Sequence, residues 1–456
     1  MNLGACLVQT VRHFFPELND WLDRLPDTRD QDAIEYDRRF LAWWGIALYL
    51  FQLGARRQLD FDLDAHDTCV LDNLNRLAQT QQTTRPVHDT LDHFLEHVVA
   101  VAFAELCLRM VKRLIRMKVL DTARLLGYLV VIVDGTGLLC FHRRHCDHCL
   151  VQRHQQTTLY LHNVLEAKLL GPAGVVLSIG SEFIDNSDAA AARGQGAEKI
   201  KQDCELKAFS RLAPKIKKAF PQARIVLAGD SLFACGRVLD ECLRNDWEFV
   251  LTFKEGHLPA LWQEYESLLP LCPRQRLERV TEDGTTQVYR WVKDLHYEDS
   301  DRRRWQLHAL ECLETSAAGV ATRFVWLTRL PVSATNVEEI ARKGGRYRWK
   351  IENEGFNRQK NSGLNLEHVY STDPEKWKAY YYLLQVAFII VQLLERGSLL
   401  RRLAQQQGKR TAVELFGSLK NIARRLLESV RQRRWPQGSY DSAQAAAIHI
   451  GLDDSS

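Results

Sequence analysis

Three acidic residues in this sequence have surroundings suited to binding divalent metal ions. VVIVDGTG brings an apolar run to Asp134, and IVLAGDSLF brings a second apolar run to Asp230. Glu352 lies in the segment RYRWKIENEGFN, four residues after Arg348. Mg²⁺ prefers oxygen ligands, and two ions about 4 Å apart can activate a water and stabilise a leaving oxygen. If the three acids converge, they predict a site for phosphoryl transfer.

Each of these acids also has an ordinary structural explanation. Asp-Gly at Asp134 is a common turn, and Asp-Ser at Asp230 is a common helix cap. Arg348 and Glu352 are spaced to form an ion pair on one helix face, worth roughly a few tenths of a kcal/mol. Glu354 is a second candidate acid, but two residues from Glu352 it points to another face of the helix. The functional interpretation therefore depends on the three acids occurring together.

The elements that must position these acids alternate between strand and helix. Continuous apolar runs are typical of strands buried on both faces, and amphipathic segments with apolar residues three and four apart are typical of helices. The predicted strands are LGYLVVIVDGTG, TLYLHNVLEAKLL, GVVLSIGSEFI, ARIVLAGDSLF and EFVLTFKEG, and EKIKQDCELKAFSRLAPKIKKAF is the helix between the third and fourth. This alternation predicts an α/β core over residues 121–256.

The pattern changes after this first part of the core. Residues 257–321 predict a mainly β insertion, and residues 322–396 return to the core with a strand followed by the helix that carries Glu352. Asn336 is the predicted N-cap of that helix. Residues 1–120 show helical periodicity and few strand signals, so they predict a helical region with a possible role in DNA binding.

The C-terminal segment, residues 397–456, predicts a basic helical tail. Between Arg396 and Trp435 there are eleven Lys or Arg residues and two Asp or Glu residues. Such an excess of positive charge suits a polyphosphate partner, and a solvated helix surface is the alternative explanation.

The composition predicts a soluble cytoplasmic protein. AYYYLLQVAFIIVQLL, residues 379–394, is shorter than the roughly 20 residues of a membrane span and contains two glutamines, so it predicts a buried core helix and no membrane partner. The N-terminal segment lacks the features of a signal peptide. The eleven cysteines are scattered, mostly in apolar segments, which favours reduced buried thiols over a disulfide framework.

VVIVDGTG, GSEFIDN, KQDCELKAFSRL, IVLAGDSLF and above all RYRWKIENEGFN resemble the DDE transposases of bacterial insertion sequences. The resemblance covers roughly residues 126–396 and is to the cut-and-paste group, which has an RNase H-like core and a β insertion before the final catalytic Glu. It implies an RNase H-like mixed sheet flanked by helices. It also implies that Asp134, Asp230 and Glu352 are catalytic and hold Mg²⁺ or Mn²⁺, with two ions expected.

The resemblance further implies double-stranded DNA as the partner, both at the element's ends and at the target, and a homodimer acting on paired ends. Arg348 matches the arginine of the family's signature helix and is predicted to position a phosphate. The signature tyrosine position holds Gly345, with Tyr347 two residues later. The signature lysine position holds Gln359, with Lys360 adjacent. Tyr347, Lys360 and, at the end of EFVLTFK, Lys254 are the further candidates for phosphate or DNA binding.

A separate motif follows the first strand of the core. FHRRHCDHCL contains Cys146 and Cys149 in a CxxC pair, with His142, His145 and His148 nearby. A CxxC pair with histidines can supply three or four zinc ligands. The sequence has no second CxxC pair or evenly spaced histidine pair to complete a recognised zinc pattern, so a reduced thiol pair in a loop is the alternative.

Together these features predict a DNA transposase that cleaves and joins DNA strands at insertion-sequence ends. Two alternatives remain open. The first is a non-catalytic DNA-binding protein derived from such an element. The second is a zinc-dependent nucleic-acid module centred on Cys146 and Cys149.

Overall fold

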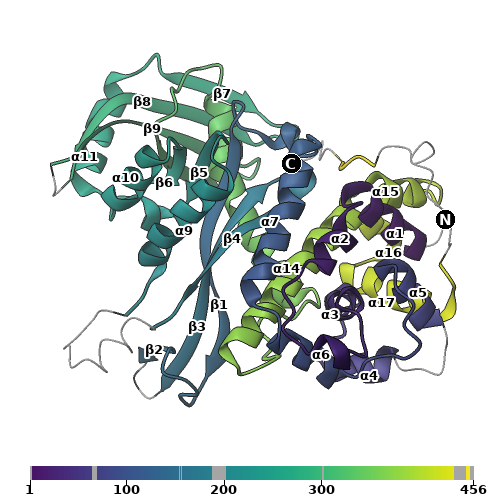
Figure 1. Ribbon diagram of the computed structural model, residues 1–456. Coiled ribbons are helices and arrows are strands. Elements are labelled where there is room, and N and C mark those ends of the chain that lie inside the picture. The colour runs from purple at the N-terminus through teal and green to yellow at the C-terminus, as the bar shows by residue number, and fades with distance from the viewer. Residues whose placement is uncertain are drawn as a thin grey trace, which may run out of the picture.

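An open sheet flanked by helices organises the chain (Figure 1). The computed structural model describes residues 3–63, 69–153, 155, 157–186, 202–299, 302–435 and 448–451. Within these residues the fold is a mixed α/β structure, as the alternating pattern predicts, and most of the strand pairs in its ten-stranded sheet are antiparallel.

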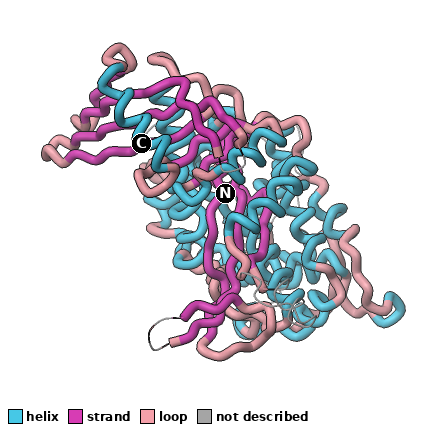
Figure 2. Tube along the Cα trace, turned by 90° about the vertical axis from the view of Figure 1, so that its left-hand side faces the viewer, coloured by secondary structure: helices cyan, strands magenta, loops and turns pink. Residues whose placement is uncertain are grey.

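The strands follow the order β2-β3-β1-β5-β6-β10-β9-β8-β7 across the sheet, and β4 pairs with β3. Their bounds are β1 (Leu129–Phe141), β2 (Leu150–Arg153), β3 (Thr158–Leu170), β4 (Val176–Ile184), β5 (Ile225–Gly229), β6 (Glu248–Thr252), β7 (Arg276–Val280), β8 (Thr286–Glu298), β9 (Arg304–Thr315) and β10 (Ala321–Thr328). β1 is parallel to β5, and β5 is parallel to β6. The strands β7 to β9 continue the same sheet through β10 rather than forming a sheet of their own (Figure 2).

β1 extends further than its sequence pattern predicts. The strand predicted over LGYLVVIVDGTG is confirmed as β1, but it begins at Leu129 and continues past Asp134 and Gly137 to Phe141. Its antiparallel pairing with β3 runs from Val131↔Leu169 to Phe141↔Tyr160, with one irregularity between Gly137 and Leu139. The partner strand β3 supplies the hydrogen bonds that keep Asp-Gly-Thr-Gly extended, where a local reading favours a turn.

Five helices that pack around the sheet lie before, between or after its strands along the chain. They are α7 (Ala100–Arg116), α9 (Glu205–Ala219), α10 (Gly236–Arg244), α11 (Pro259–Leu268) and α14 (Pro374–Arg396). Short 3-10 turns are η1 (Gln31–Ala33), η2 (Asp121–Ala123), η3 (Pro172–Gly174), η4 (Ser231–Phe233) and η5 (Leu269–Leu271). α9 packs against β4 and α10, while α7 packs against β4 and α14.

The two ends of the chain form one helical body beside the sheet (Figure 1). It contains α1 (Leu3–Phe14), α2 (Leu18–Asp23), α3 (Arg38–Leu50), α4 (Gln58–Leu63), α5 (Cys69–Ala78), α6 (His88–Glu96), α15 (Ser398–Gln405), α16 (Ala412–Phe416) and α17 (Leu419–Gln432). The Asn73 side chain in α5 donates to the carbonyls of Val430 and Arg433 and accepts from the Trp435 amide. The basic C-terminal segment is thus held against the N-terminal helices.

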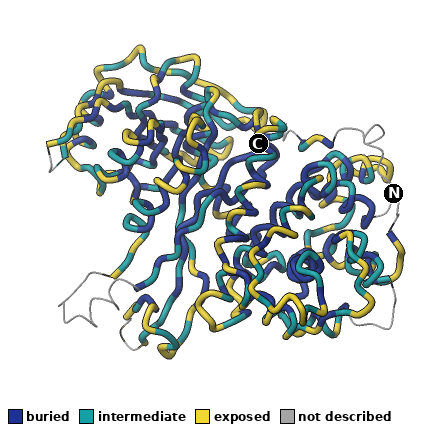
Figure 3. Tube along the Cα trace, in the orientation of Figure 1, coloured by how far each residue is buried: buried dark blue, intermediate teal, exposed yellow. Residues whose placement is uncertain are grey.

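α14 is 23 residues long and lies in the interior, where it contacts α3 and α7 (Figure 3). By length and composition α14 could cross a membrane, but 83% of its apolar 18-residue window is buried inside the protein. The prediction that residues 379–394 form a buried core helix is therefore confirmed. Trp43 and Trp44 in α3 are each 1% exposed and belong to the same apolar core.

The segment that carries Glu352 is helical but irregular. It consists of α12 (Val337–Glu339), the π-helix η6 (Ile340–Gly345), the 3-10 turn η7 (Arg346–Trp349), the π-helix η8 (Ile351–Asn357) and α13 (Arg358–Asn361). The Asn336 side chain accepts from the Ser333 amide and donates to the Pro331 carbonyl, and it caps no helical N–H, so the predicted side-chain cap is wrong. π-turns within helices are frequent at functional sites.

Two glycines bring this helical segment close to the sheet. A Cβ on Gly344 would lie 2.6 Å from Cγ2 of Val250 in β6, and one on Gly345 would lie 2.3 Å from Cε2 of Trp326 in β10. The indole of Trp326 thus fills the space beside the backbone at Gly345.

We expect Gly345→Ala to destabilise the protein by about 1–3 kcal/mol, because the added methyl group overlaps the Trp326 indole. Trp326→Leu in the same chain should recover part of that loss by removing the overlapping ring atoms. Urea unfolding of the two single variants and the double variant measures this coupling. Gly256→Ala is the control, since a Cβ there meets nothing within 4 Å. Additive single effects would contradict the proposed overlap.

Candidate active site

Asp134 and Asp230 lie on neighbouring parallel strands. The parallel pairing of β1 with β5 runs from Leu129↔Ile225 to Ile132↔Ala228. Asp134 is two residues beyond the last of these pairs, and Asp230 directly follows the end of β5. Because parallel strands run in the same direction, both carboxylates belong to the same end of this part of the sheet.

Asp230 also has the local structural role that its sequence allows. Its Oδ1 accepts a hydrogen bond of 2.9 Å from the Leu232 amide and so caps the 3-10 turn η4. The cap fixes the orientation of this carboxylate at the end of β5. Capping and participation in an acidic site are compatible, since a carboxylate has two oxygens and about four acceptor positions.

Arg348 connects the acid on β1 with the acid on the helical segment. Its Nη1 lies 2.8 Å from Glu352 Oε1 and 3.4 Å from Asp134 Oδ2. The predicted ion pair between Arg348 and Glu352 is confirmed, and the contact with Asp134 adds a link to the sheet that a surface pair would lack. A single guanidinium therefore stands between two of the three predicted acids.

The carboxylates act on one another electrostatically. The pKa of Asp134 is raised to about 7, chiefly by burial, against the opposing effect of the Arg348 charge. The negative charges of Glu352, Asp230 and Glu205 add to the rise. With this pKa the carboxyl is partly protonated at neutral pH, because burial and the neighbouring acids disfavour its charged form. A divalent cation offsets the negative charge of these acids, so the donor set and its charge fit a Mg²⁺ or Mn²⁺ site.

Glu205 is a member of this acidic group that the sequence interpretation missed. It is the first residue of α9, and a Cβ on Gly135 would lie 2.1 Å from its Oε1. Burial and the charge of Asp230 raise its pKa. An acid in the first turn of a helix is ordinary in sequence, so only the packing of α9 over Gly135 reveals this position.

The three predicted acids are brought together less tightly than the ligands of a preformed metal site. Among the described residues, one group of potential metal ligands has all its ligand atoms within 4.8 Å of one another. That group consists of histidines and cysteines and does not include these acids. At the acidic site the Arg348 guanidinium takes up the space between Asp134 and Glu352 and stands in for a cation.

The other predicted phosphate-binding residues are placed differently from one another. Lys254 lines a cavity of about 520 Å³ together with Arg346, Arg348 and the half-exposed Trp349, so it shares a surface with the acidic site. Lys360 pairs with Glu367 at 2.6 Å.

Tyr347 and Gln359 have partners of their own. The ring of Tyr347 lies 4.6 Å from Lys350 Nζ. Gln359, at the position where the resemblance predicts a lysine, is fully buried and donates to Gln385 at 2.8 Å. Glu354 binds Arg358 and Arg396 at 3.2 and 3.1 Å, which confirms that it faces another side of the helix than Glu352.

The predicted thiol pair lies in the loop that follows β1, the strand of Asp134, and has additional partners. Cys146 and Cys149 are joined by His145 and His162, and the four side chains form the group noted above. His145 was among the nearby histidines in sequence, whereas His162 comes from β3 and no spacing rule identifies it.

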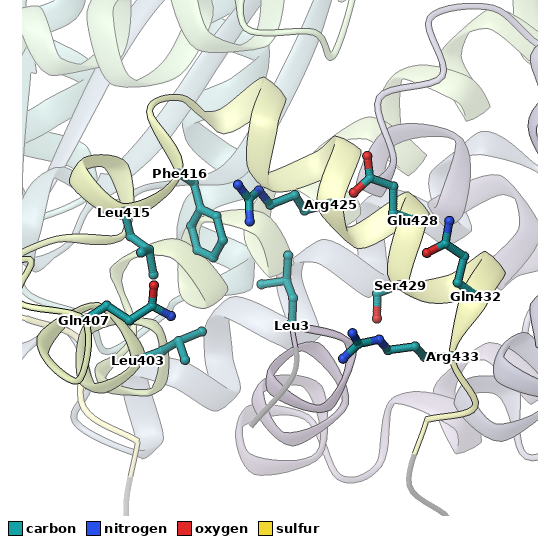
Figure 4. Close-up of a pocket in the computed structure, with 10 residues that line it drawn as sticks. All are labelled: Leu3, Leu403, Gln407, Leu415, Phe416, Arg425, Glu428, Ser429, Gln432 and Arg433. Carbon is teal, nitrogen blue, oxygen red and sulfur yellow. The ribbon is translucent and has the colours of Figure 1, made fainter.

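A further cavity, of about 370 Å³, lies in the helical body among α1, α15, α16 and α17 (Figure 4). Its lining is a mixture of apolar side chains and long polar ones, and Glu428, its carboxylate, is paired with Arg424 at 3.1 Å. It has no grouping of acids or nucleophiles comparable to the one around Asp134.

No protein-family model matches this chain, and no curated protein matches it either.

Proposed function

We propose that the chain is a DDE-type DNA transposase that cleaves and joins DNA strands at insertion-sequence ends. The observation that carries the proposal is the placement of Asp134 and Asp230 on adjacent parallel strands, with Glu352 linked to Asp134 through Arg348. This is an acidic site at one end of a parallel strand pair. Burial and the neighbouring acids raise the pKa of Asp134, and a bound cation would offset the negative charge of those acids.

The strand arrangement supports an RNase H-like core within the larger sheet. Five strands follow the order β4-β3-β1-β5-β6, in which β3 is antiparallel to both β4 and β1, and β1, β5 and β6 are parallel. In this proposal β7 to β9 are the insertion before the catalytic Glu.

When bound, Mg²⁺ or Mn²⁺ would lower the pKa of a water and stabilise charge on the phosphate oxygens. Asp134, Asp230 and Glu352 would hold it, with Glu205 close enough to add to the field. Arg348 orients Asp134 and Glu352 relative to each other, and it can exchange these contacts for a phosphate oxygen. Deprotonation of Asp134 is the step that makes it a ligand.

DNA is the proposed substrate because cations and aromatic rings share the surface beside the acids. Lys254 and Arg346 can neutralise phosphates, and the half-exposed Trp349 can stack on a base. The proposed working form is a homodimer on paired DNA ends in the cytoplasm.

The test compares Glu352→Gln with Glu354→Gln in nicking of supercoiled plasmid DNA with Mg²⁺, with Mn²⁺ and with a chelator. We expect the wild-type protein to nick DNA only with metal, Glu352→Gln to lose at least about a hundredfold in rate, and Glu354→Gln to keep most of it. Glu354 is the matched control because it lies in the same helical segment but pairs with Arg358 and Arg396 instead of with Arg348.

Metal-dependent nicking that survives Glu352→Gln would exclude this site. A wild-type protein that binds DNA but does not nick it with either metal would favour the alternative, a non-catalytic DNA-binding protein derived from a transposase. Salt-dependent DNA binding, measured by fluorescence anisotropy, distinguishes that outcome from a protein that does not bind DNA.

A further inference from the structure

His145, Cys146, Cys149 and His162, named here the His/Cys cluster, converge where the loop after β1 returns to the sheet. Three of them lie in the loop between β1 and β2, and His162 lies in β3. β3 pairs with both β1 and β2, so the loop that connects those two strands must cross β3 near His162. Figure 1 shows β2 beside the lower end of β3, with the helix α14 nearby.

Four of the six separations among the ligand atoms are close to those around a tetrahedral zinc ion, and the other two are within 4.8 Å. Cys146 Sγ and Cys149 Sγ are 3.5 Å apart, His162 Nε2 is 3.4 and 3.5 Å from the two sulfurs, and His145 Nδ1 is 3.4 Å from Cys149 Sγ. Bonds of about 2.3 Å to sulfur and about 2.05 Å to nitrogen give tetrahedral edges of about 3.8 Å for S···S and about 3.6 Å for N···S.

The donor atoms select the kind of metal. Thiolate and imidazole suit zinc, whereas Mg²⁺ and Ca²⁺ prefer oxygen. Four protein ligands complete a tetrahedron and leave no position for water or substrate, which is the arrangement of a structural rather than a catalytic zinc site.

The surroundings of the cluster are already ordered by protein contacts. The Cys149 side chain is fully buried, and its carbonyl accepts from the Asn186 side chain at 2.9 Å. The backbone N–H of Asn186 donates to the His148 carbonyl at 2.8 Å. His162 packs against the Trp377 ring of α14 at 5.6 Å between centroids. These contacts hold the loop backbone and one imidazole in place, so little ordering is needed when a metal binds.

We propose that His145 Nδ1, Cys146 Sγ, Cys149 Sγ and His162 Nε2 bind one Zn²⁺ ion in a closed structural site. The ion fastens the loop between β1 and β2 onto β3. The same loop carries Arg143 and Arg144 on its exposed side, and Arg144 lies over the Tyr160 ring at 5.9 Å. Zinc therefore fixes the position of two cations at this end of the sheet. The inference does not rest on the proposed transposase activity.

The experiment measures zinc and cobalt binding by the full-length chain. Protein purified without chelator is analysed for metal content, then stripped, and titrated with Co²⁺ under reducing conditions. We expect about one zinc per chain, and with cobalt the intense d–d bands and thiolate charge-transfer band of a tetrahedral site with two sulfur ligands. Zn²⁺ should displace the cobalt and raise the thermal unfolding temperature.

Matched variants separate the cluster from its neighbours. Cys146→Ser with Cys149→Ser should abolish the cobalt bands and lower the bound zinc at least tenfold. Cys140→Ser and His142→Asn should leave both unchanged, because Cys140 is exposed on β1, His142 is exposed in the loop, and neither belongs to the cluster. Circular dichroism shows whether each variant folds. His162→Asn, which keeps both thiols, is the second test, and it should weaken cobalt binding and change its spectrum.

A wild-type protein without zinc, and without tetrahedral cobalt bands after reduction, would overturn the proposal. So would zinc or cobalt binding that persists in the double cysteine variant. Mass spectrometry after alkylation identifies the rival state, a disulfide between Cys146 and Cys149, and its presence in protein kept reduced and supplied with zinc would also overturn it.

Discussion

Replacing Asp134 with asparagine is expected to abolish metal-dependent DNA nicking and, without divalent metal, to make the folded protein more stable above pH 7. Loss of a metal ligand at the reacting centre removes about 4 kcal/mol of transition-state stabilisation, which is about a thousandfold in rate. The gain in stability has a different cause. Burial and three neighbouring acids disfavour a negative charge at this position, and the asparagine side chain carries none.

The pH dependence follows from the raised pKa. In the unfolded chain Asp134 has its ordinary pKa of 3.8, and in the folded protein the value is about 7. The folded state therefore holds the proton more tightly, and this carboxyl lowers the stability progressively as pH rises from about 4 to about 7. Above pH 7 the full penalty applies, so the variant gains on the order of 2–4 kcal/mol there and nothing near pH 4.

Urea unfolding at pH 4.5 and pH 8 in chelator, for wild type and Asp134→Asn, measures this difference. Mg²⁺ or Mn²⁺ should stabilise the wild type at pH 8 and have little effect on the variant. Asp23→Asn is the control, because its side chain is 58% exposed. A variant that is less stable than the wild type at both pH values would show that Asp134 has a structural rather than a functional role.

Removing the positive charge of Lys168 is expected to have the largest effect on stability. Lys168 and Glu166, both on β3, have fully buried side chains and form an ion pair with Nζ 2.8 Å from Oε2. The hydroxyls of Tyr381 and Ser181 donate to the other oxygen of Glu166. Lys168→Met leaves this carboxylate buried without its cation, which costs about 3–5 kcal/mol.

The double variant Glu166→Gln with Lys168→Met distinguishes the pair from simple packing. Replacing both charges removes the unpaired carboxylate, so most of the lost stability should return. Urea unfolding of the wild type, both single variants and the double variant gives the coupling free energy. Equal losses in Lys168→Met and in the double variant would show that the packing of the lysine chain against Phe356, over whose ring Nζ lies at 5.5 Å, is what matters.

Much of the α/β core is predictable because its strands and helix have strong local patterns. The segments around Val164, Ile179, Leu227 and Val250 are rich in apolar residues and are predicted as strands, and each forms a strand with a buried core. The predicted helix before the second aspartate is confirmed as α9 from Glu205 onward, and its first predicted residues, 198–201, lie outside the described residues.

Positions that depend on neighbours in space could not be predicted. Asp134 reads as a turn in sequence, and its extended conformation depends on pairing with β3. The space beside Gly345, where the resemblance predicts a tyrosine, is occupied by the Trp326 indole. Gln359, where the resemblance predicts a lysine, forms a buried amide pair with Gln385. In each case the deciding partner is far away along the chain.

The sequence by itself determined which side chains are the candidates for metal-dependent chemistry, because Asp134, Asp230, Glu352 and the spacing of Arg348 are local facts. Tertiary structure alone decided how they meet. Parallel pairing of β1 with β5 placed the two aspartates at one end of the sheet, and packing of α9 over Gly135 added Glu205. Charges interact through space rather than along the chain, so the raised pKa of Asp134 arises only in the folded protein.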